Sequence, residues 1–496
     1  MIHNSPTPSF PAWKCLLAPM RQKLPKAIQE VRASTLCQLE QRFAATLPTA
    51  LFAKALSGPN SRDRTYTQQR TFWCFLWQCL HGRVSNREVV RQLQALLTLQ
   101  GTAPISPEDG AYCLARQRLP ETLFSSALKK TAQACEHAAP STGFLQGRPI
   151  KVVDGTVLTL ADTQENQAEY PQVSTMAKGC AFPLLKVVAV FSLLSGAILT
   201  ASCAALHVSE FELLYQLAAF FGPKDIVLGD RGFGNGSVLA WLQSLQVDFI
   251  ARSDRKTDGR GRQKRLGKND WLVLWKRQKT SAVVPDALFG LCPLKIPVRI
   301  VRGRLYQRGF RVRQVTLVTT LLDPKLYPAA DILKAYLRRW RMEMCLDDLK
   351  TTMGMNTLRC QTPAMVRKEM FMHLIAHNLA RSVMLQAVVE HGVALEQLSF
   401  KGTLDALCQF TQAAAQAASA RQRRELWDCL LRTIAADRLP LRPNRREPRA
   451  VKYQPRTYGR LNQPRHQYKD RPKRHARRTL SRLRQQLQKP TNEAHP

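Results

Sequence analysis

Runs of apolar positions predict a helical beginning, an α/β middle and a helical end for this chain. The first 144 residues read as helical, and strand-like runs rich in β-branched residues begin near residue 149. The expected elements follow in chain order: strands at about 149–160, 184–194 and 197–204, a helix near 209–221, a strand at 225–230, a helix at 236–246 and a strand at 247–252. Strands that alternate with helices in this way predict an α/β core.

A different pattern begins after residue 252. Ile296, Val298 and Ile300 alternate with basic neighbours, and residues 310–313 repeat the alternation. One apolar and one basic face predict a half-buried sheet whose open side suits phosphate. The expected organisation is therefore a helical N-terminal domain (1–147), the first part of a core (148–252), a β-rich insertion (253–312), the remainder of the core (313–385), a helical region (386–440) and a basic tail without hydrophobic periodicity, expected to be disordered (441–496).

One predicted helix carries an unusual charged stripe. At about 100° per residue, Tyr336, Arg339, Glu343 and Lys350 fall within a sector of about 60°. An aromatic ring, two cations and a carboxylate on one face suit a polyanionic partner. The competing interpretation is a solvated face with ordinary pairs four residues apart, such as Glu343 with Arg339, and the helix alone does not decide between the two.

Two acids interrupt the apolar runs upstream of this helix. Asp154 lies within the first expected strand, and Asp230 ends the strand at 225–230 before a glycine-rich turn. Acids at strand positions are costly if buried alone, so they usually have a partner or an ion. Taken singly, each is better explained as a turn residue. Together with Glu343 they favour a site for two Mg²⁺ ions, or Mn²⁺, which take oxygen ligands and act in pairs in phosphodiester chemistry.

These residues carry a family resemblance. Asp154-Gly-Thr, Asp230-Arg-Gly-Phe and the spacing Tyr336-x2-Arg339-x3-Glu343-x6-Lys350 resemble the signature of bacterial insertion-sequence transposases of the DDE class, in the branch called the insertion-sequence-four family. The resemblance covers about residues 70–382, and the Tyr-Arg-Glu-Lys spacing is its most specific part. Asp347, on the same helix as Glu343, is a rival for the third acid.

The resemblance implies a ribonuclease-H-like core and cut-and-paste transposition. Asp154, Asp230 and Glu343 would be the metal ligands, and Arg339 and Lys350 would grip phosphates near the cut. Tyr336 would position the terminal backbone. Water would cut a strand at the transposon end, the freed 3′ hydroxyl would form a hairpin on the opposite strand, and the reopened end would join target DNA. Relatives act as a protein dimer on DNA with cleavage in trans, and the N-terminal region is expected to recognise the ends.

Two tryptophans in the insertion have two possible roles. Trp271 and Trp275 lie four residues apart, and aromatic residues in this position could stack on an extruded base, as in relatives that form a hairpin end. Core packing is the commoner role for either ring. Both interpretations remain open from the sequence.

The net charge and the cysteine content indicate which kind of partner the protein binds and in which compartment it works. The 496 residues carry a net charge of +38, which favours DNA or RNA over a membrane or an acidic protein. From residue 442 onward, 17 Lys or Arg stand against 3 acids, as expected of a nonspecific DNA-binding tail. Thirteen cysteines without a Cys-x2-Cys pair indicate reduced thiols in a cytoplasm. The resemblance to insertion-sequence transposases implies that this is a bacterial cytoplasm and that the protein is associated with the nucleoid. No signal peptide is apparent in the polar, proline-rich start.

Several further segments admit more than one structure. The uncharged run 187–209 has the length of a membrane helix, but Ser195-Gly196 at its middle favours two buried strands.

Ser85 and Ser106 are expected to cap helices near 86–98 and 107–118. These two helices form either a helix-turn-helix, with Arg116 and Arg118 near phosphates, or a plain bundle. Asp331 is expected to cap the helix that carries Glu343, and Gly354 to follow its end.

Two other functions share most of these features. A domesticated relative would keep the fold and the charge as a noncatalytic DNA-binding protein, although every signature residue is present here. A metal-dependent nuclease would cut DNA without joining it. The sequence favours the transposase over both.

Overall fold

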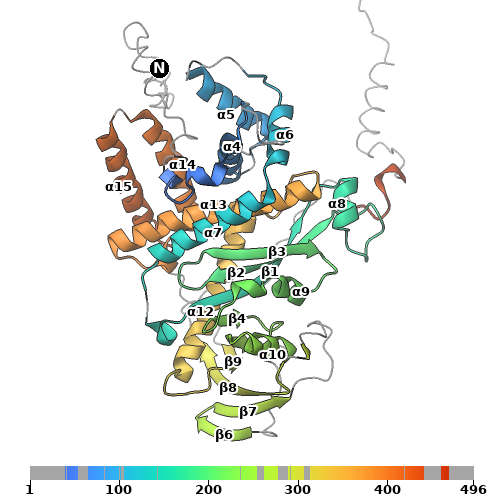
Figure 1. Cartoon of the computed structure of the whole chain (residues 1–496), viewed down its shortest axis with the longest axis vertical. Helices are drawn as coiled ribbons and strands as arrows, with labels where there is room; N and C mark the ends of the chain where they lie inside the picture. Colours follow the sequence, from blue (N-terminus) through green and yellow to red (C-terminus); the bar gives the residue numbers. More distant parts are fainter. Residues whose placement is uncertain are drawn as a thin grey trace, which may run out of the picture.

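The chain folds around one large twisted sheet. A computed structural model describes residues 40, 42–53, 65–82, 84–99, 101, 105–141, 143–234, 236–253, 262–276, 289–290, 292–305, 313–417, 419–440 and 460–467. Within these ranges the fold is mixed α/β, with helices on both faces of the sheet (Figure 1). The predicted alternation at residues 310–312 and most of the basic tail lie outside the described residues.

The sheet has nine strands among the described residues, in the order β3-β2-β1-β4-β5-β9-β8-β7-β6. The strands are β1 Ile150–Thr159, β2 Leu184–Ser192, β3 Ile198–Ala205, β4 Ile226–Gly229, β5 Asp248–Arg252, β6 Arg262–Gly267, β7 Asp270–Lys276, β8 Lys295–Leu305 and β9 Arg313–Thr319. β1, β4 and β5 are parallel, and the remaining pairs are antiparallel. The strands of the predicted insertion therefore continue the core sheet through β9.

Helices flank the sheet in chain order. They are α4 Gln68–Leu80, α5 Asn86–Leu99, α6 Gly110–Arg118, α7 Glu121–Ala138, α8 Gln164–Glu169, α9 Glu210–Gln216, α10 Gly236–Ser244, α12 Ala329–Asp347, α13 Pro363–His391, α14 Phe400–Gln416 and α15 Ala420–Ala436. The predicted strands and helices between residues 149 and 252 all occur, with ends shifted by a few residues.

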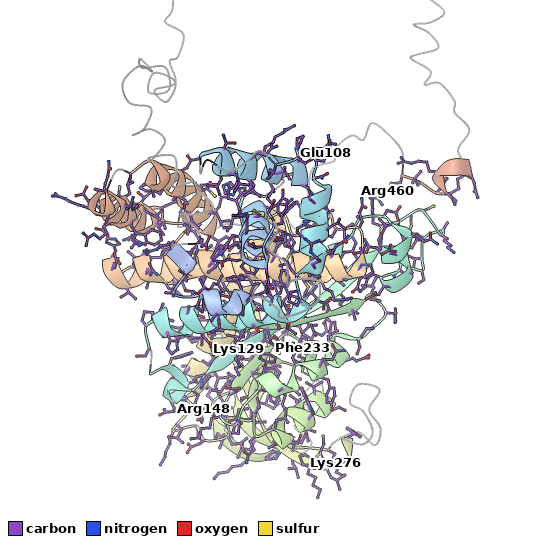
Figure 2. All side chains as sticks on the ribbon, turned by 45° about the horizontal axis from the view of Figure 1, so that its top comes forward. Glu108, Lys129, Arg148, Phe233, Lys276 and Arg460 are labelled. Carbon is purple, nitrogen blue, oxygen red and sulfur yellow. The ribbon has the colours of Figure 1, made fainter. Side chains whose placement is uncertain are left out.

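The two faces of the sheet pack into different cores because strand residues alternate between them. Val152 and Leu228 face the core that α7, α12 and α13 share with the N-terminal helices. Val153 and Val227 face the second core, with α9 and α10. In Figure 1 the helices α4, α5 and α6 lie beyond α13, at the opposite end of the molecule from β6 and β7. Figure 2 shows the same separation between Glu108 and Lys276.

The uncharged run 187–209 forms β2 and β3, as predicted. Gly196 turns the chain between them with a φ of 72°, a left-handed conformation that favours glycine. Asn378 of α13 binds the start of β3, accepting from the Ile198 amide at 2.8 Å and donating to its carbonyl at 2.9 Å. Among the helices that the structure describes, none is long and apolar enough to cross a membrane.

The N-terminal helices correct one prediction and confirm another. The Ser85 hydroxyl accepts from the Glu88 amide at 3.2 Å, so it caps α5 as expected. Ser106 does not cap a helix, because α6 begins later, after Asp109. The helix-turn-helix alternative would place Arg116 near phosphates, but its side chain is buried, with the guanidinium 4.9 and 5.1 Å from the ring centroids of Phe75 and Tyr112. Arg116 therefore holds helices together and is not available to DNA.

The helix α12 begins and ends differently from its prediction. Its first residue, Ala329, follows Pro328, and Asp331 lies within the first turn, so the predicted capping role of Asp331 is wrong. A π turn, η4 Asp348–Thr352, continues the helix to just before Gly354, with the Met353 amide bonded to the Asp348 carbonyl at 2.9 Å. This five-residue hydrogen bond replaces the α-helical pattern, so about 100° per residue no longer applies beyond Asp347.

The β-rich segment supports α12 directly. A Cβ at Gly303 of β8 would lie 2.3 Å from a methyl carbon of Leu333, so the Leu333 side chain of α12 packs directly against the backbone of this strand. Arg299 of β8 is fully buried and binds Asp270 through two bonds of 2.8 and 2.6 Å. Its guanidinium also donates to the carbonyls of Leu321 and Tyr327, in the segment that leads into α12.

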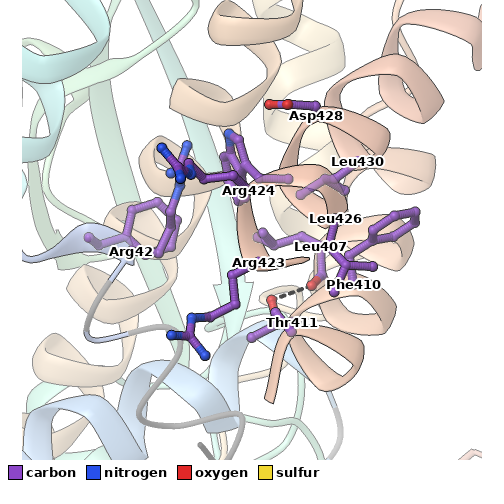
Figure 3. Close-up of a pocket in the computed structure, with 12 residues that line it drawn as sticks. Arg42, Leu407, Phe410, Thr411, Arg423, Arg424, Leu426, Asp428 and Leu430 are labelled. Atoms are coloured by element: carbon purple, nitrogen blue, oxygen red, sulfur yellow. Dashed lines mark hydrogen bonds between the residues drawn. The ribbon is translucent and has the colours of Figure 1, made fainter. Parts of the chain in front are cut away.

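A pocket lies on the far side of α13, away from the sheet. It has a volume of about 270 Å³ and is lined by α14, α15 and the segment around Arg42. Figure 3 shows arginines and apolar side chains around it, including Arg42 and Arg423. The Arg42 guanidinium stacks on Trp427 at 3.1 Å from the ring centroid. None of the residues predicted for the active site lines this pocket.

Candidate active site

The first two acids are brought together by parallel pairing. Val152 of β1 lies opposite Leu228 of β4, so two residues further along each chain, Asp154 comes beside Asp230. Neighbouring strands are about 4.8 Å apart, and residues of the same parity share a face. Both acids therefore lie on the face that packs against α12.

A tight turn fixes the second acid. The Asp230 carboxylate accepts from the amides of Gly232 at 2.8 Å and Phe233 at 3.3 Å. The Phe233 side chain folds back over Gly229, where an added Cβ would be 2.6 Å from the Phe233 Cβ. The glycine before Asp230 is therefore a steric requirement of this turn.

The helix α12 brings the signature residues to the same face. Arg339 is buried and donates to the Glu343 carboxylate at 2.7 Å, while another guanidinium nitrogen lies 4.0 Å from the Asp154 carboxylate. The Tyr336 ring is also buried, and the Arg339 guanidinium carbon lies 5.4 Å from its centroid. The ordinary Glu343–Arg339 pair is thus present, but Arg339 links the helix to an acid of the sheet as well.

Electrostatic coupling shows that these groups share one environment. Burial raises the pKa of Asp154 to about 6, Arg339 opposes this, and Glu343 and Asp230 raise it further. Burial also raises the pKa of Tyr336, while Arg339 lowers it and Asp230 raises it. For Arg339, burial alone would lower the pKa, but Tyr336, Glu343 and Asp154 raise it by more. The two aspartates, Tyr336, Arg339 and Glu343 therefore form one cluster.

The donor set of this cluster fits a hard divalent cation. Three carboxylates supply oxygen ligands, and two of them already hold a cationic group, the Arg339 guanidinium. As the side chains stand, no three His, Cys, Asp or Glu residues of the described part are close enough together to hold a metal ion. Glu343 is turned toward Arg339, which occupies one of its carboxylate oxygens.

Lys350 and the rival acid Asp347 lie outside the cluster around Arg339. Lys350 is half-buried in the π turn, and within the described ranges its side chain makes no ion pair with the three acids. The rival acid Asp347 is exposed and accepts from the Thr351 hydroxyl at 2.9 Å. That bond directs Asp347 away from Arg339 and favours Glu343 as the third acid.

The two tryptophans lie far from the acids. Both are on β7, which is separated from β4 by β5, β9 and β8, a lateral distance of about 19 Å at the usual strand spacing. Their side chains pack on the core of α9 and α10, on the opposite face from α12. Trp275 is buried, whereas Trp271 is half-buried with the Arg302 guanidinium 5.3 Å from its ring.

One further acid, which no sequence motif singled out, lies beside the cluster. Glu210 is the first residue of α9, and its carboxylate lies against Gly155, directly after Asp154. Burial raises the pKa of Glu210, and Asp230 raises it further. The available signal was the glycine that follows Asp154, since a glycine in a strand marks a close approach.

Known proteins resemble the chain over most of its length. The sequence model of a family described as Transposase DDE domain matches residues 145–379, a range that contains Asp154, Asp230 and Glu343. The transposase InsG for insertion sequence element IS4 of Escherichia coli (strain K12) is 28% identical over 403 residues, which are 80% of this chain and 88% of that protein.

Among solved structures, the piggyBac transposase synaptic complex with hairpin DNA matches at a TM-score of 0.38 and 8% identity, over 82% of this chain and 83% of that one. This structural similarity is too low to carry an argument. The matched family and the sequence relative agree with the signature residues. Both support an insertion-sequence-four DDE transposase.

Proposed function

We propose that this transposase moves its element by a cut-and-paste reaction with Asp154, Asp230 and Glu343 as the acids of the active site, in a ribonuclease-H-like core. One observation carries the proposal: the β1–β4 register and α12 bring all three acids into one electrostatic cluster around Arg339. These acids would hold two Mg²⁺ ions, or Mn²⁺. Bound cations would activate the attacking oxygen and stabilise the leaving one.

The side chains around the acids have separate tasks. Arg339 presents a planar fork that suits a phosphate once Glu343 has turned away from it. Tyr336, buried beside Arg339, positions the terminal backbone, and Lys350 adds a point charge at the far end of the stripe. Water displaces the 3′ oxygen of the transposon end, and the 3′ hydroxyl so released attacks the opposite strand to form the hairpin. A second water opens the hairpin and frees the 3′ hydroxyl again. This hydroxyl then attacks target DNA by the same in-line displacement.

The partner is double-stranded DNA, at both the transposon ends and the target. A net charge of +38 supports binding to the phosphate backbone. The helices before residue 148 would recognise the ends, and the segment 253–312 would contact the flanking phosphates. Two copies on DNA would each cut the end held by the other. The reaction takes place in the bacterial cytoplasm, at the nucleoid.

Purified protein, Mg²⁺ and a labelled DNA with the terminal repeats of the element would test this function. We expect cleavage followed by joining, both lost in Asp154→Ala and Glu343→Ala while DNA binding persists. Asp347→Ala is the matched control, since this exposed acid is on the same helix and should leave both steps intact.

The outcomes separate this function from its rivals. Binding without cutting by the unchanged protein would make it a noncatalytic DNA-binding protein. Cutting without joining would make it a nuclease. Loss of activity in Asp347→Ala but not in Glu343→Ala would overturn the assignment of the third acid.

A further inference from the structure

We propose that Glu210 is a fourth acid of the active site and contributes a carboxylate to cation binding beside Asp154 and Asp230. The inference rests on the proposed function, and it adds a residue outside the three-acid signature. It concerns the start of α9, on the opposite face of the sheet from α12.

The contact with Gly155 is the first line of support. A Cβ at this glycine would lie 2.6 Å from one carboxylate oxygen of Glu210, 2.9 Å from its carbon and 3.4 Å from the other oxygen. Any other residue at this position would push the carboxylate away. The residue next to Asp154 thus leaves room for an acid from another element.

The strand ends explain how acids from two faces can meet. Asp154 and Gly155 point to opposite faces of β1, but β4 pairs with β1 only as far as Leu228 opposite Val152. β4 ends at Gly229, so beyond it no strand of the described sheet separates Glu210 from Asp230. Asp230 raises the pKa of Glu210 across this open end of the sheet, so the two acids already interact. Rotation of the Glu210 side chain would bring its carboxylate to a cation held there.

The charge of Glu210 is poorly compensated. Its half-buried carboxylate makes no hydrogen bond or ion pair with another described residue. Asp230 repels it, and the opposing charge, Lys186, donates a hydrogen bond to the Val208 carbonyl at 2.5 Å. A bound cation would offset both the desolvation of this carboxylate and its repulsion by Asp230.

The competing explanation is stabilisation of the helix. An acid in the first turn interacts favourably with the helix dipole, and Glu210 occupies that position. Glu212 lies in the same turn and is exposed, so it serves the same purpose without contacting the cluster. Glu212→Gln is therefore the matched control for Glu210→Gln.

Two measurements on the full-length protein test the inference: binding of Mn²⁺ followed by the electron paramagnetic resonance of the free ion, and the Mn²⁺ concentration that gives half-maximal end cleavage. We expect Glu210→Gln to raise both the dissociation constant and this concentration by about 10-fold or more. Gly155→Ala should act in the same direction, because its methyl group displaces the carboxylate while Asp154 is retained. Glu212→Gln should match the unchanged protein, and thermal melting checks that every variant is folded.

The inference is overturned if Glu210→Gln binds Mn²⁺ and cleaves DNA with unchanged Mn²⁺ dependence, or if Glu212→Gln shows the same loss. Failure of the proposed function has a different signature, since the unchanged protein would then show no Mn²⁺-dependent cleavage. That result removes the basis of this inference as well.

Discussion

Arg339 donates a 2.7 Å hydrogen bond to Glu343, the acid one helical turn further along α12. The same guanidinium lies 4.0 Å from Asp154 on the sheet, so one buried cation offsets two acids from different elements. Divalent cations would compete with this guanidinium for both carboxylates. We therefore expect Arg339 to be released toward DNA when the cations bind.

Replacement of Arg339 tests this exchange. Arg339→Gln should reduce the rate of end cleavage by about 100-fold or more, because a phosphate loses its donor. The same variant should raise the pKa of Asp154, which Arg339 lowers, and carbon-13 NMR of labelled aspartate can follow that titration. Arg338→Gln is the control, because the Arg338 guanidinium lies over the Phe144 ring at 4.5 Å instead. Equal loss of cleavage in both variants would contradict a specific role for Arg339.

Asp154 should make the metal-free protein sensitive to pH. Its pKa rises from 3.8 in the unfolded chain to about 6 in the fold, chiefly through burial. The fold thus favours the neutral acid, so this contribution to stability is complete below pH 4 and is lost as the pH rises through 6. The loss is at most about 3 kcal/mol at pH 8.

Asp154→Asn removes this dependence. Without divalent cations, we expect the variant to unfold at a higher temperature than the unchanged protein at pH 8, with the difference much reduced at pH 4. Added Mg²⁺ should stabilise the unchanged protein at pH 8 and have a smaller effect on Asp154→Asn. Asp347→Asn, at an exposed position, should follow the unchanged protein. Scanning calorimetry provides all of these comparisons.

The buried Arg299–Asp270 pair should be essential for stability. Arg299→Met leaves the Asp270 carboxylate buried without its partner, which costs about 3–5 kcal/mol in the free energy of unfolding. Arg421→Met breaks the exposed pair with Glu425 and should cost less than about 1 kcal/mol. Urea titrations measure both changes. Similar values for the two variants would mean that burial of the first pair has no energetic consequence.

The tryptophans of β7 should have different roles. Trp275→Ala should lower the free energy of unfolding by about 3–5 kcal/mol, since its ring is buried in the core. Trp271→Ala should cost less stability, because this ring is half-buried. If Trp271 stacks on an extruded base, the variant should bind DNA with an unpaired base about 10-fold more weakly and bind paired DNA unchanged. Equal weakening for both DNAs would rule out stacking.

The local sequence predicted the acids because each stands out from its surroundings. Asp154 and Asp230 interrupt apolar strands, and Glu343 lies on a charged stripe, so their elements could be identified without a structure. The third acid was ambiguous only because Asp347 shares the helix, and the Thr351 hydroxyl that binds Asp347 could not be foreseen.

Tertiary contacts account for what the sequence did not reveal. Arg116 resembled a phosphate ligand, but its guanidinium lies against the ring of Phe75, which is distant in sequence, as well as that of Tyr112 one turn earlier on α6. The π turn at Lys350 depends on how the helix end packs, which periodicity does not report. Glu210 has no motif of its own, and its position is apparent only from the contact with Gly155.

The close packing of Leu333 on Gly303 has a consequence for mutations remote from the acids. Leu333 and Glu343 lie on the same helix, α12, which packs on β8 through this contact. A substitution of Gly303 would therefore press on the helix that carries the third acid, although β8 contributes none of the three. Transposition would then be sensitive to changes in β8 as well as to changes in the acids.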